Sequence, residues 1–503
     1  AVCGYPPEDL LLKRHFLEDN RAAIEHICDL CPRKKLIVGF AERQATKTYN
    51  AAAVIQDSKI ETVYRKARLP NFSVFDESRY FTPGTQPVHI HMDGMSVALL
   101  ICYDMWDLDW ITSWLTPLGH SDLILNISAS PFNLGKLSRR ETVIRQCAQT
   151  LGSAMLYCNL VGGQDELVFD GRSMVFDAKG LLQARAKAFA QDLLFLDIHK
   201  TNTGSMVISN TGCAPALNEP LDEVYHALVL GTRDYIYKNG FQHVLLGVSG
   251  GIDSAVTAAI AAAAVGPEHV ICITMPSRFN SPGTIMDANK LAHNIGVPLY
   301  TIPIGNILDG FHQELSKVEG WDDKGIAYEN LQARIRGTLL MSLSNQLNAL
   351  VLTTGNKSET SVGYSTLYGD TAGGFAVIKD VPKTMVYDLA RYINKQAKQD
   401  IIPQETIRRP PSAELRPDQK DTDSLPNYDL LDRIIQGYVE HDKSSAELIS
   451  MGLPENDVQR VICLIDRNEY KRRQSPPGVR ITSKAFGKDR RLPITNRYTP
   501  LNK

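Results

Sequence analysis

The sequence Leu246-Gly-Val-Ser-Gly-Gly-Ile-Asp-Ser254 joins an apolar run, 244–248, to an alanine-rich segment, 254–265. We expect a strand before this turn and a helix after it. Gly250 and Gly251 can adopt positive φ, which lets successive backbone N–H groups point inward as an anion-binding nest. The N-terminus of the following helix adds a partial positive charge. Because no Gly-Lys-Ser/Thr follows, we expect a phosphate-binding loop of a type other than Walker A.

Strand-like and helix-like segments alternate after this loop. The expected strands are 270–274, 299–304 and 350–354, and the expected helices are 286–295 and 331–347. Such repeated strand–helix units predict an open, doubly wound parallel sheet.

The first part of the chain has a different pattern of short apolar runs bounded by Gly, Asp, Asn and Pro. The expected strands are 36–40, 51–55, 97–101, 123–127, 155–160 and 193–198, with helices at 14–30 and 138–151. This pattern predicts a layered α/β domain. Residues 201–220 are rich in Thr, Asn, Gly, Ser and Pro and are interpreted as a linker. We therefore expect domains at 1–200 and 221–503.

Length and composition limit the class of protein. The chain has 503 residues and a formal net charge of −2, so overall charge gives no reason to expect binding to nucleic acid or to a membrane. No apolar run reaches the roughly 18 residues that a membrane span needs. The nine cysteines are scattered, and Cys28 and Cys31 lack a second pair at zinc-site spacing. Free thiols in a cytoplasmic protein are the expectation.

The motif Ser-Gly-Gly-x-Asp-Ser resembles the pyrophosphate loop of the N-type ATP pyrophosphatases, whose fold is like that of the adenine nucleotide α-hydrolases. Five later segments are similar to the NAD synthetase family, and the similarity extends over 231–496. These segments are Glu329-Asn-Leu-Gln-Ala-Arg334, Thr354-Gly-Asn-Lys-Ser-Glu359, Tyr368-Gly-Asp370, Pro382-Lys-Thr384 and Pro410-Pro-Ser-Ala-Glu-Leu-Arg416. That family adenylates the nicotinate carboxylate of deamido-NAD, releases pyrophosphate and lets ammonia displace AMP.

The resemblance implies a role for each matching residue. The expected ATP-binding residues are Leu246, Gly247, Val248, Ser249, Gly250, Gly251, Ile252, Asp253, Ser254, Thr354 and Lys383. Asp253 and Glu359 would share Mg²⁺, and Lys383 would neutralise phosphate charge as the acyl adenylate forms. The expected deamido-NAD contacts are Asn330, Glu359, Asp370 and Lys471, with Ser412 a weaker candidate for phosphate or metal.

A basic stretch, 471–491, holds eight Lys or Arg and one acid, Asp489. The stretch is short and only Phe486 could stack on a base, which argues against nucleic-acid binding. The pyrophosphate of a dinucleotide suits it better. Lys484 and Lys488 are second choices after Lys471 for this contact.

The segment Leu100-Ile-Cys102-Tyr-Asp-Met-Trp106 places a cysteine at the end of an apolar strand. Together with Lys66 in Tyr64-Arg-Lys-Ala-Arg-Leu-Pro70, Phe75-Asp-Glu77 and Asn126-x-Ser-x-Ser-Pro-Phe132, it resembles the nitrilase superfamily. That family folds as an α-β-β-α sandwich and hydrolyses amides with Glu, Lys and Cys. Glutamine and ammonia therefore join ATP and deamido-NAD as expected small-molecule substrates.

Cys102 would attack the glutamine amide, while Lys66 and the Tyr103 backbone N–H stabilise the oxyanion. Glu77 matches the supporting glutamate that orients Lys66, and the resemblance places Phe72, Ser130 and Lys136 in the glutamine pocket. By spacing, the general-base glutamate would precede Ala1. We expect the natural chain to be longer at this end; a chain that began at Ala1 would use free ammonia only.

The sequence therefore predicts an NAD synthetase domain fused to a nitrilase-like glutaminase, forming a homo-oligomer through the synthetase domain. One alternative is another amidating ATP pyrophosphatase, such as a GMP or asparagine synthetase, although the contexts of Cys102 and Lys66 argue against both. A second is an ammonia-only synthetase with an inactive glutaminase domain. A third is a non-catalytic nucleotide-binding scaffold, which the intact Asp253, Glu359 and Lys383 disfavour.

Overall fold

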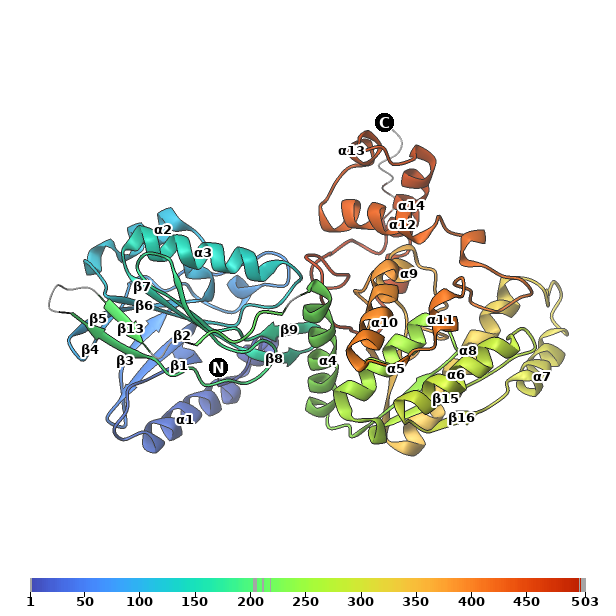
Figure 1. Cartoon of the computed structure of the whole chain (residues 1–503), viewed down its shortest axis with the longest axis horizontal. Helices are drawn as coiled ribbons and strands as arrows, with labels where there is room; N and C mark the ends of the chain where they lie inside the picture. Colours follow the sequence, from blue (N-terminus) through green and yellow to red (C-terminus); the bar gives the residue numbers. More distant parts are fainter. Residues whose placement is uncertain (1, 202–205, 210–211, 218, 497, 499–503) are drawn as a thin grey trace. The chain divides into compact units, whose positions relative to one another are not determined.

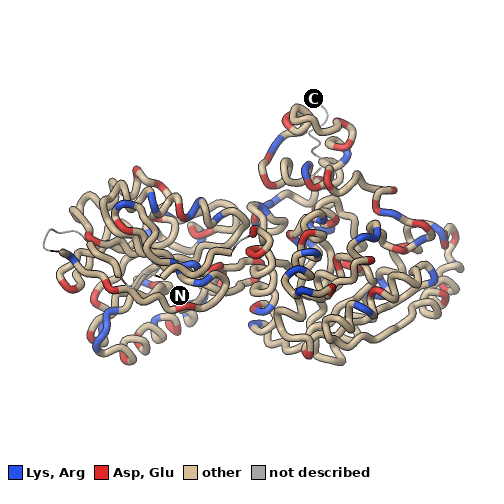
Figure 2. The backbone as a smooth tube through the Cα atoms, in the orientation of Figure 1, with Lys and Arg blue, Asp and Glu red and all other residues tan. Residues whose placement is uncertain are grey.

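The computed structural model describes residues 2–201, 206–209, 212–217, 219–496 and 498. The chain divides into two compact units. Unit 1 is Ala1–Gln164 with Val168–Asn218, and unit 2 is Asp165–Leu167 with Glu219–Lys503. Figure 2 shows basic and acidic residues interspersed over each unit.

Unit 1 contains two sheets between helices. The first is antiparallel, with β1 (Leu36–Gln44), β2 (Lys47–Gln56) and β3 (Lys59–Arg65) in that order. The second has the order β11 (Leu182–Arg185), β10 (Met174–Phe176), β7 (Ala154–Asn159), β6 (Leu123–Ser128), β5 (Met95–Ile101) and β4 (His89–Met92). A separate ribbon pairs β8 (Val161–Gln164) with β9 (Leu167–Asp170).

Helices cover the outer faces of both sheets (Figure 1). α1 (Arg14–Leu30) packs on the first sheet, while α2 (Leu108–Leu115) and α3 (Lys136–Leu151) pack on the second. The predicted α-β-β-α sandwich is confirmed. Its strands look continuously apolar because both faces are buried: in β5, Ala98 and Leu100 face α2 and α3, whereas Val97, Leu99 and Ile101 pack between the sheets.

One detail of unit 1 differs from the sequence prediction. The expected strand 193–198 is wrong for most of its length, since Leu193 and Phe195 are exposed and β12 covers Asp197–Lys200. The segment interpreted as a linker, 201–220, includes β13 (Met206–Ser209), which pairs with β12, while 202–205, 210, 211 and 218 lie outside the described residues. Ile198, Met206 and Ile208 pack on the core between the two sheets, which explains why this polar segment forms a hairpin.

Unit 2 is built on a five-stranded, fully parallel sheet. Its order is β16 (Leu299–Thr301), β15 (Val270–Thr274), β14 (His243–Gly247), β17 (Ala349–Thr353) and β18 (Phe375–Ala376). The predicted doubly wound sheet is confirmed. Because β14 comes first in sequence but lies in the middle, the strand order reverses beside it, and ligands bind at the carboxyl end of such a position.

Helices cover both faces of this sheet (Figure 1). One face carries α7 (Gly305–Leu315) and α8 (Ile326–Leu347), which pack on Leu245, Ile273 and Val351. The alanine-rich α5 (Ile252–Val265) packs against four other helices, α4 (Pro220–Lys238), α6 (Pro282–Ile295), α10 (Lys383–Ala397) and α11 (Gln404–Arg408). The small side chains of α5 permit this close packing.

A helical layer completes unit 2 and was not predicted from the sequence. Its helices are α9 (Lys357–Val362), α12 (Tyr428–Ile435), α13 (Ser445–Ser450), α14 (Glu455–Arg467) and α15 (Glu469–Arg472). Val362, Leu431, Ile435, Leu448 and Ile462 share one apolar core in this layer. Among the described residues, no helix combines the length and the apolar character needed to cross a membrane.

Candidate functional site

A cavity of about 480 Å³ opens in unit 2 at the carboxyl ends of β14 and β17. It is lined by most of the residues that the sequence predicts for ATP and deamido-NAD. These are Gly247, Val248, Ser249, Gly250, Gly251, Ile252, Asp253, Ser254, Asn330, Thr354, Glu359, Asp370, Lys383, Ser412 and Lys471. Segments far apart in the chain thus meet in one pocket, at the place where doubly wound sheets bind ligands.

Two sets of predicted residues lie elsewhere. Leu246 is fully buried in β14 and does not line the cavity. Lys484 and Lys488 are also absent from the lining, and Lys484 pairs with Asp442. Of the three lysines considered for dinucleotide binding, only Lys471 faces this pocket.

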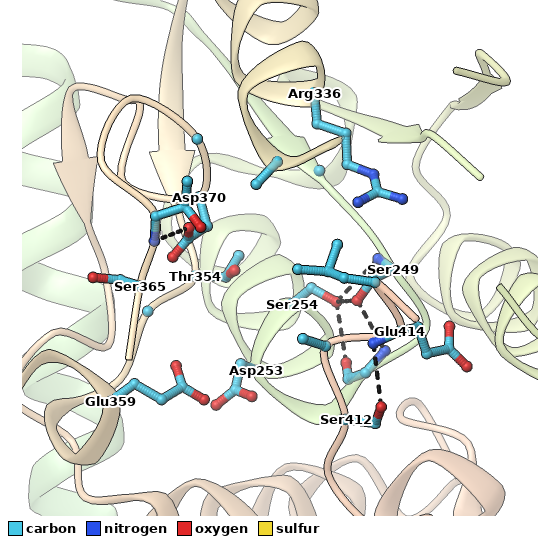
Figure 3. Close-up of a pocket in the computed structure, with 18 of the residues that line it drawn as sticks. Ser249, Asp253, Ser254, Arg336, Thr354, Glu359, Ser365, Asp370, Ser412 and Glu414 are labelled. Carbon is cyan, nitrogen blue, oxygen red and sulfur yellow. Dashed lines mark hydrogen bonds between the residues drawn. The ribbon is translucent and has the colours of Figure 1, made fainter. Parts of the chain in front are cut away.

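The phosphate loop turns at Gly250, which has a φ of +86°. A Cβ atom there would lie 2.1 Å from the carbonyl oxygen of Thr284, so only glycine fits. Gly251 differs from the prediction, because it caps α5 with a φ of −84°. Ser249 and Ser254 lie together in this turn (Figure 3), and the Gly251 N–H donates to the Ser249 hydroxyl at 3.2 Å. The turn therefore needs one left-handed glycine.

Two carboxylates and one ammonium group form the charged centre of the pocket. Lys383 Nζ donates to Asp253 Oδ2 at 2.5 Å and to Glu359 Oε1 at 3.1 Å. Burial by itself would lower the pKa of Lys383, but the charges of Asp253 and Glu359 raise it. Burial raises the pKa of Glu359 to about 8, and the charge of Lys383 opposes this shift. Protons therefore compete with any cation that Glu359 binds.

The chemistry of this centre fits a divalent cation. Figure 3 shows the carboxylates of Asp253 and Glu359 side by side, facing the cavity. Asn356 Nδ2 donates to Asp253 Oδ1 at 2.9 Å and so orients that carboxylate. Two carboxylates with nucleotide phosphates as further ligands form a donor set typical of Mg²⁺. Among the described residues, no cluster of three or more His, Cys, Asp or Glu forms a metal site from protein ligands alone.

Three of the predicted deamido-NAD contacts, Asn330, Asp370 and Lys471, also line the cavity. Lys471 Nζ donates to the carbonyl oxygens of Gly363 and Ser365 at 2.7 and 2.8 Å. Burial lowers the pKa of Lys471, and the charge of Asp370 opposes this. Asp370 lies open to the pocket and accepts from the Thr366 N–H at 2.6 Å, yet the surrounding protein desolvates its carboxyl group and raises its pKa. Asn330 accepts from the Thr366 hydroxyl at 2.6 Å.

The cavity also contains charged groups that the sequence prediction missed. Arg336 lies on its wall (Figure 3), where burial lowers its pKa to about 10. Its guanidinium donates to the Met275 carbonyl at 3.0 Å and to Asn280 at 3.2 Å. Glu414 accepts from Asn280 at 2.8 Å and from Thr284 at 3.0 Å. Arg336 lies two positions beyond the quoted motif that ends at Arg334 and could have been found as its extension.

Unit 1 places Cys102 directly after β5, in a strained turn with a φ of +47°. The buried amide of Asn126 holds both sides of this residue: the Cys102 N–H donates to Asn126 Oδ1 at 3.1 Å, and Asn126 Nδ2 donates to the Cys102 carbonyl at 3.2 Å. Non-glycine residues in this region cost free energy and persist where surrounding contacts hold them. Asn126 is therefore a support that the motif did not reveal.

Lys66 and Glu77 form a buried pair in the same unit. Lys66 Nζ lies 2.8 Å from both Glu77 oxygens, and the Tyr5 hydroxyl donates to Glu77 Oε1 at 2.8 Å. Burial alone would lower the pKa of Lys66, but the charges of Glu77, Cys102 and Asp104 raise it. Lys66 thus keeps its positive charge and interacts electrostatically with the Cys102 sulfur.

Of the residues predicted for the glutamine pocket, Phe72 and Ser130 lie on loops of this unit and Lys136 lies at the start of a helix. The exposed ring of Phe72 contacts that of Tyr103, with 5.3 Å between centroids. Ser130 is buried, and its N–H donates to Asn159 at 3.0 Å. Lys136 begins α3 and donates to the Pro131 carbonyl at 2.8 Å.

A buried ion pair behind this region was missed. Arg140 and Asp170, both about 1% exposed, lie 3.0 Å apart, and Asn159 Nδ2 lies 3.3 Å from Asp170. Asn159 thus connects the ion pair to Ser130. Both charges fall inside segments that look ordinary in sequence, so only the tertiary contacts reveal the network.

Unit 1 holds a cysteine at a strand end and a buried lysine–glutamate pair, and unit 2 holds a glycine turn beside two carboxylates; this combination fits a two-domain amidating ligase. Residues 5–206 match the carbon-nitrogen hydrolase family model, and residues 224–475 match the NAD synthase model. The chain belongs to the glutamine-dependent NAD⁺ synthetase family, which confirms the predicted family.

Two relatives with this family name span almost the whole chain. The Aquifex aeolicus protein is 43% identical over 527 residues, covering 99% of this chain and 92% of the relative. The Acinetobacter baylyi protein is 43% identical over 503 residues, covering 99% and 91%. The structure of the Acinetobacter baumannii enzyme, solved with adenosine diphosphate, is 41% identical, has a TM-score of 0.77 and covers 98% of this chain and 90% of that one.

Proposed function

We propose that this chain converts deamido-NAD to NAD in an ATP-dependent amidation and obtains the ammonia from glutamine. The observation that carries the proposal is the pairing, in one chain, of the Asp253–Lys383–Glu359 centre with the Cys102–Lys66–Glu77 site. Relatives named glutamine-dependent NAD⁺ synthetases along the full length support it over the other amidating ATP pyrophosphatases.

In the synthetase unit, the nicotinate carboxylate attacks the α-phosphorus of ATP, and the P–O bond to pyrophosphate breaks. The N–H groups of the loop around Gly250 bind the phosphate oxygens. Lys383 neutralises the charge that develops on them, and Asp253 and Glu359 keep its ammonium group in place. Ammonia then attacks the acyl adenylate, AMP leaves and one proton is released. Bound Mg²⁺, held by Asp253 and Glu359, would supply electrostatic stabilisation of the phosphates.

In the glutaminase unit, the Cys102 thiolate attacks the side-chain amide of glutamine and the C–N bond breaks. Lys66 and the Tyr103 N–H stabilise the oxyanion, and water later releases glutamate from the thioester. A carboxylate must carry the proton to the departing ammonia. Glu77 is unsuited to this role, because Lys66 donates to both of its oxygens and Tyr5 to one. Glu77 therefore supports Lys66, and a second glutamate is needed for the transfer.

The remaining expectations concern the whole protein. We propose a homo-oligomer formed through the synthetase domain, which is supported by exposed apolar side chains on α7 and α8, among them Phe311, Ile326 and Met341. A cytoplasmic location agrees with nine cysteines that are all free. The domain boundary at 201–220 agrees with the family-model match ending at 206 and the next one starting at 224.

The test is NAD formation from deamido-NAD, ATP and Mg²⁺, measured in parallel with ammonia and with glutamine. Activity with both donors supports the full proposal. Activity with ammonia alone supports the synthetase and favours the ammonia-only alternative for this chain. Absence of activity with either donor, in protein shown to be folded, would refute the assignment.

A further inference from the structure

One face of α12 is directed at the charged centre without lining the cavity. Tyr428 and Asp432 are four residues apart, so both lie on the same side of the helix. The Tyr428 ring lies 5.2 Å from Lys383 Nζ, and its hydroxyl donates to Asp421 at 2.8 Å. Neither Tyr428 nor Asp432 lines the pocket. This face of α12 therefore acts on the site through other residues.

α10 begins at Lys383 without a cap from its own segment. Its N-cap residue is Pro382, which makes no side-chain hydrogen bond to the helix. The first N–H groups of a helix lack partners inside the helix and need other acceptors. Without such acceptors, the backbone of Lys383 would be poorly fixed.

Asp432 supplies the missing cap from another helix. Its Oδ2 accepts from the Thr384 N–H at 3.0 Å and from the Thr384 hydroxyl at 2.8 Å. Its Oδ1 accepts from the Ser358 hydroxyl, whose oxygen accepts the Lys383 N–H at 2.8 Å. A carboxylate at this place also complements the positive end of the helix dipole. One side chain thus ties the start of α10 to α9.

The residues beside these contacts are the ones that meet in the pocket. Ser358 precedes Glu359, and Thr384 follows Lys383. The separation of Lys383 Nζ from Glu359 Oε1, 3.1 Å, depends on the relative placement of α9 and α10. Asp432 contacts both segments and neither reacting group.

We propose that Asp432 is a positioning residue for the amidation: it joins the starts of α9 and α10 so that Lys383 and Glu359 meet Asp253 in working geometry. The inference rests on the proposed function of the synthetase unit. A displacement of about 1 Å in such a site costs roughly 100-fold in rate. The effect belongs to kcat, since the charge that Lys383 neutralises develops during reaction.

The variants separate the charge from the hydrogen bonds. Asp432→Ala removes both, whereas Asp432→Asn keeps an oxygen for Thr384 and removes the charge. Ser358→Ala breaks only the link to α9 and the Lys383 N–H. Asp429→Asn is the matched control, because Asp429 is an exposed acid on the same helix. Ammonia is the nitrogen donor throughout, so that the glutaminase unit does not enter the measurement.

We expect kcat to fall about 100-fold in Asp432→Ala and about tenfold in Asp432→Asn and Ser358→Ala, with KM for ATP changed less than about threefold.

Circular dichroism and thermal unfolding report the folded fraction of each variant. If Asp432→Ala does not fold, the kcat values of Asp432→Asn and Ser358→Ala test the proposal in its place. Variants that lose thermal stability but keep the kcat and KM of Asp429→Asn would overturn the proposal, because Asp432 would then serve stability alone. If the wild type and Asp429→Asn are folded but inactive with ammonia, the proposed function itself fails, and this inference fails with it.

Discussion

Replacement of Gly250 by alanine tests the phosphate loop at its most constrained point. The new Cβ would lie 2.1 Å from the Thr284 carbonyl oxygen, which belongs to the backbone of α6. Relief of this contact requires a movement of roughly 1 Å, enough to cost about 100-fold in rate where phosphate must be oriented. The left-handed conformation, with φ at +86°, adds about 1–2 kcal/mol of strain for an alanine.

We therefore expect Gly250→Ala to lower kcat/KM for ATP by about 100-fold or more. The assay is NAD formation from deamido-NAD with saturating ammonia and varied ATP. Alkylation of Cys102 by iodoacetamide, which reports on unit 1, should be unchanged. Gly251→Ala should lose less of its kcat/KM for ATP, because Gly251 has an ordinary φ and its Cβ would meet only the Ser249 hydroxyl, at 3.2 Å.

Gly296→Ala is the matched control for backbone strain. Gly296 follows the last residue of α6 with a φ of +80°, and a Cβ atom there would meet open space. This variant should lose stability through the same left-handed strain and keep its activity. Equal activity of Gly250→Ala and Gly296→Ala, per folded molecule, would refute the reasoning that the close approach of Gly250 to Thr284 shapes the ATP site.

Four further predictions concern the charged groups and their supports. Cys102→Ala should abolish NAD formation with glutamine and leave the ammonia-dependent rate unchanged; loss of both would contradict separate sites. Lys66→Met should slow glutamine hydrolysis by about 100-fold and leave the ammonia-dependent rate unchanged, because the oxyanion loses a neighbouring positive charge, and full glutaminase activity would speak against this role. Asn126→Leu should slow glutamine hydrolysis by about tenfold or more, because the turn at Cys102 loses both of its hydrogen bonds to Asn126. Full activity would show that the turn keeps its conformation without these two hydrogen bonds. Magnesium binding should tighten as pH rises through about 8, where Glu359 loses its proton, and calorimetry should find this dependence removed in Glu359→Gln.

Local signals in the sequence determined much of this protein. Apolar periodicity located α1 at 14–30, the same bounds that the structure has, and found most strands of the two larger sheets to within a few residues. The loop from Gly247 to Ser254 could be recognised because its chemistry is local: a strand, a turn and a helix start lie within a few residues of one another. The same holds for Cys102 at the end of β5.

Only the tertiary structure decided how these motifs are supported. The exclusion of any side chain at Gly250 depends on the carbonyl oxygen of Thr284, 34 positions away in the chain. Within the residues that the structure describes, 193–196 form no strand, whereas Asp197–Lys200 pair with Met206–Ser209 of β13; strand formation depends on such a partner, which lies elsewhere in the chain.

The side chains that support the reacting groups could not be assigned that role from the sequence. Asp432, Asn126 and the pair of Arg140 with Asp170 act through contacts between residues far apart in the chain. A lone Asp on a helix has no local pattern that distinguishes a buried support from a surface residue. Asn126 begins a recognisable motif, but its two hydrogen bonds to Cys102 are seen only in the folded chain. Motifs identify the groups that react, because chemistry requires particular residue types, whereas the packing that holds them exists only once the chain has folded.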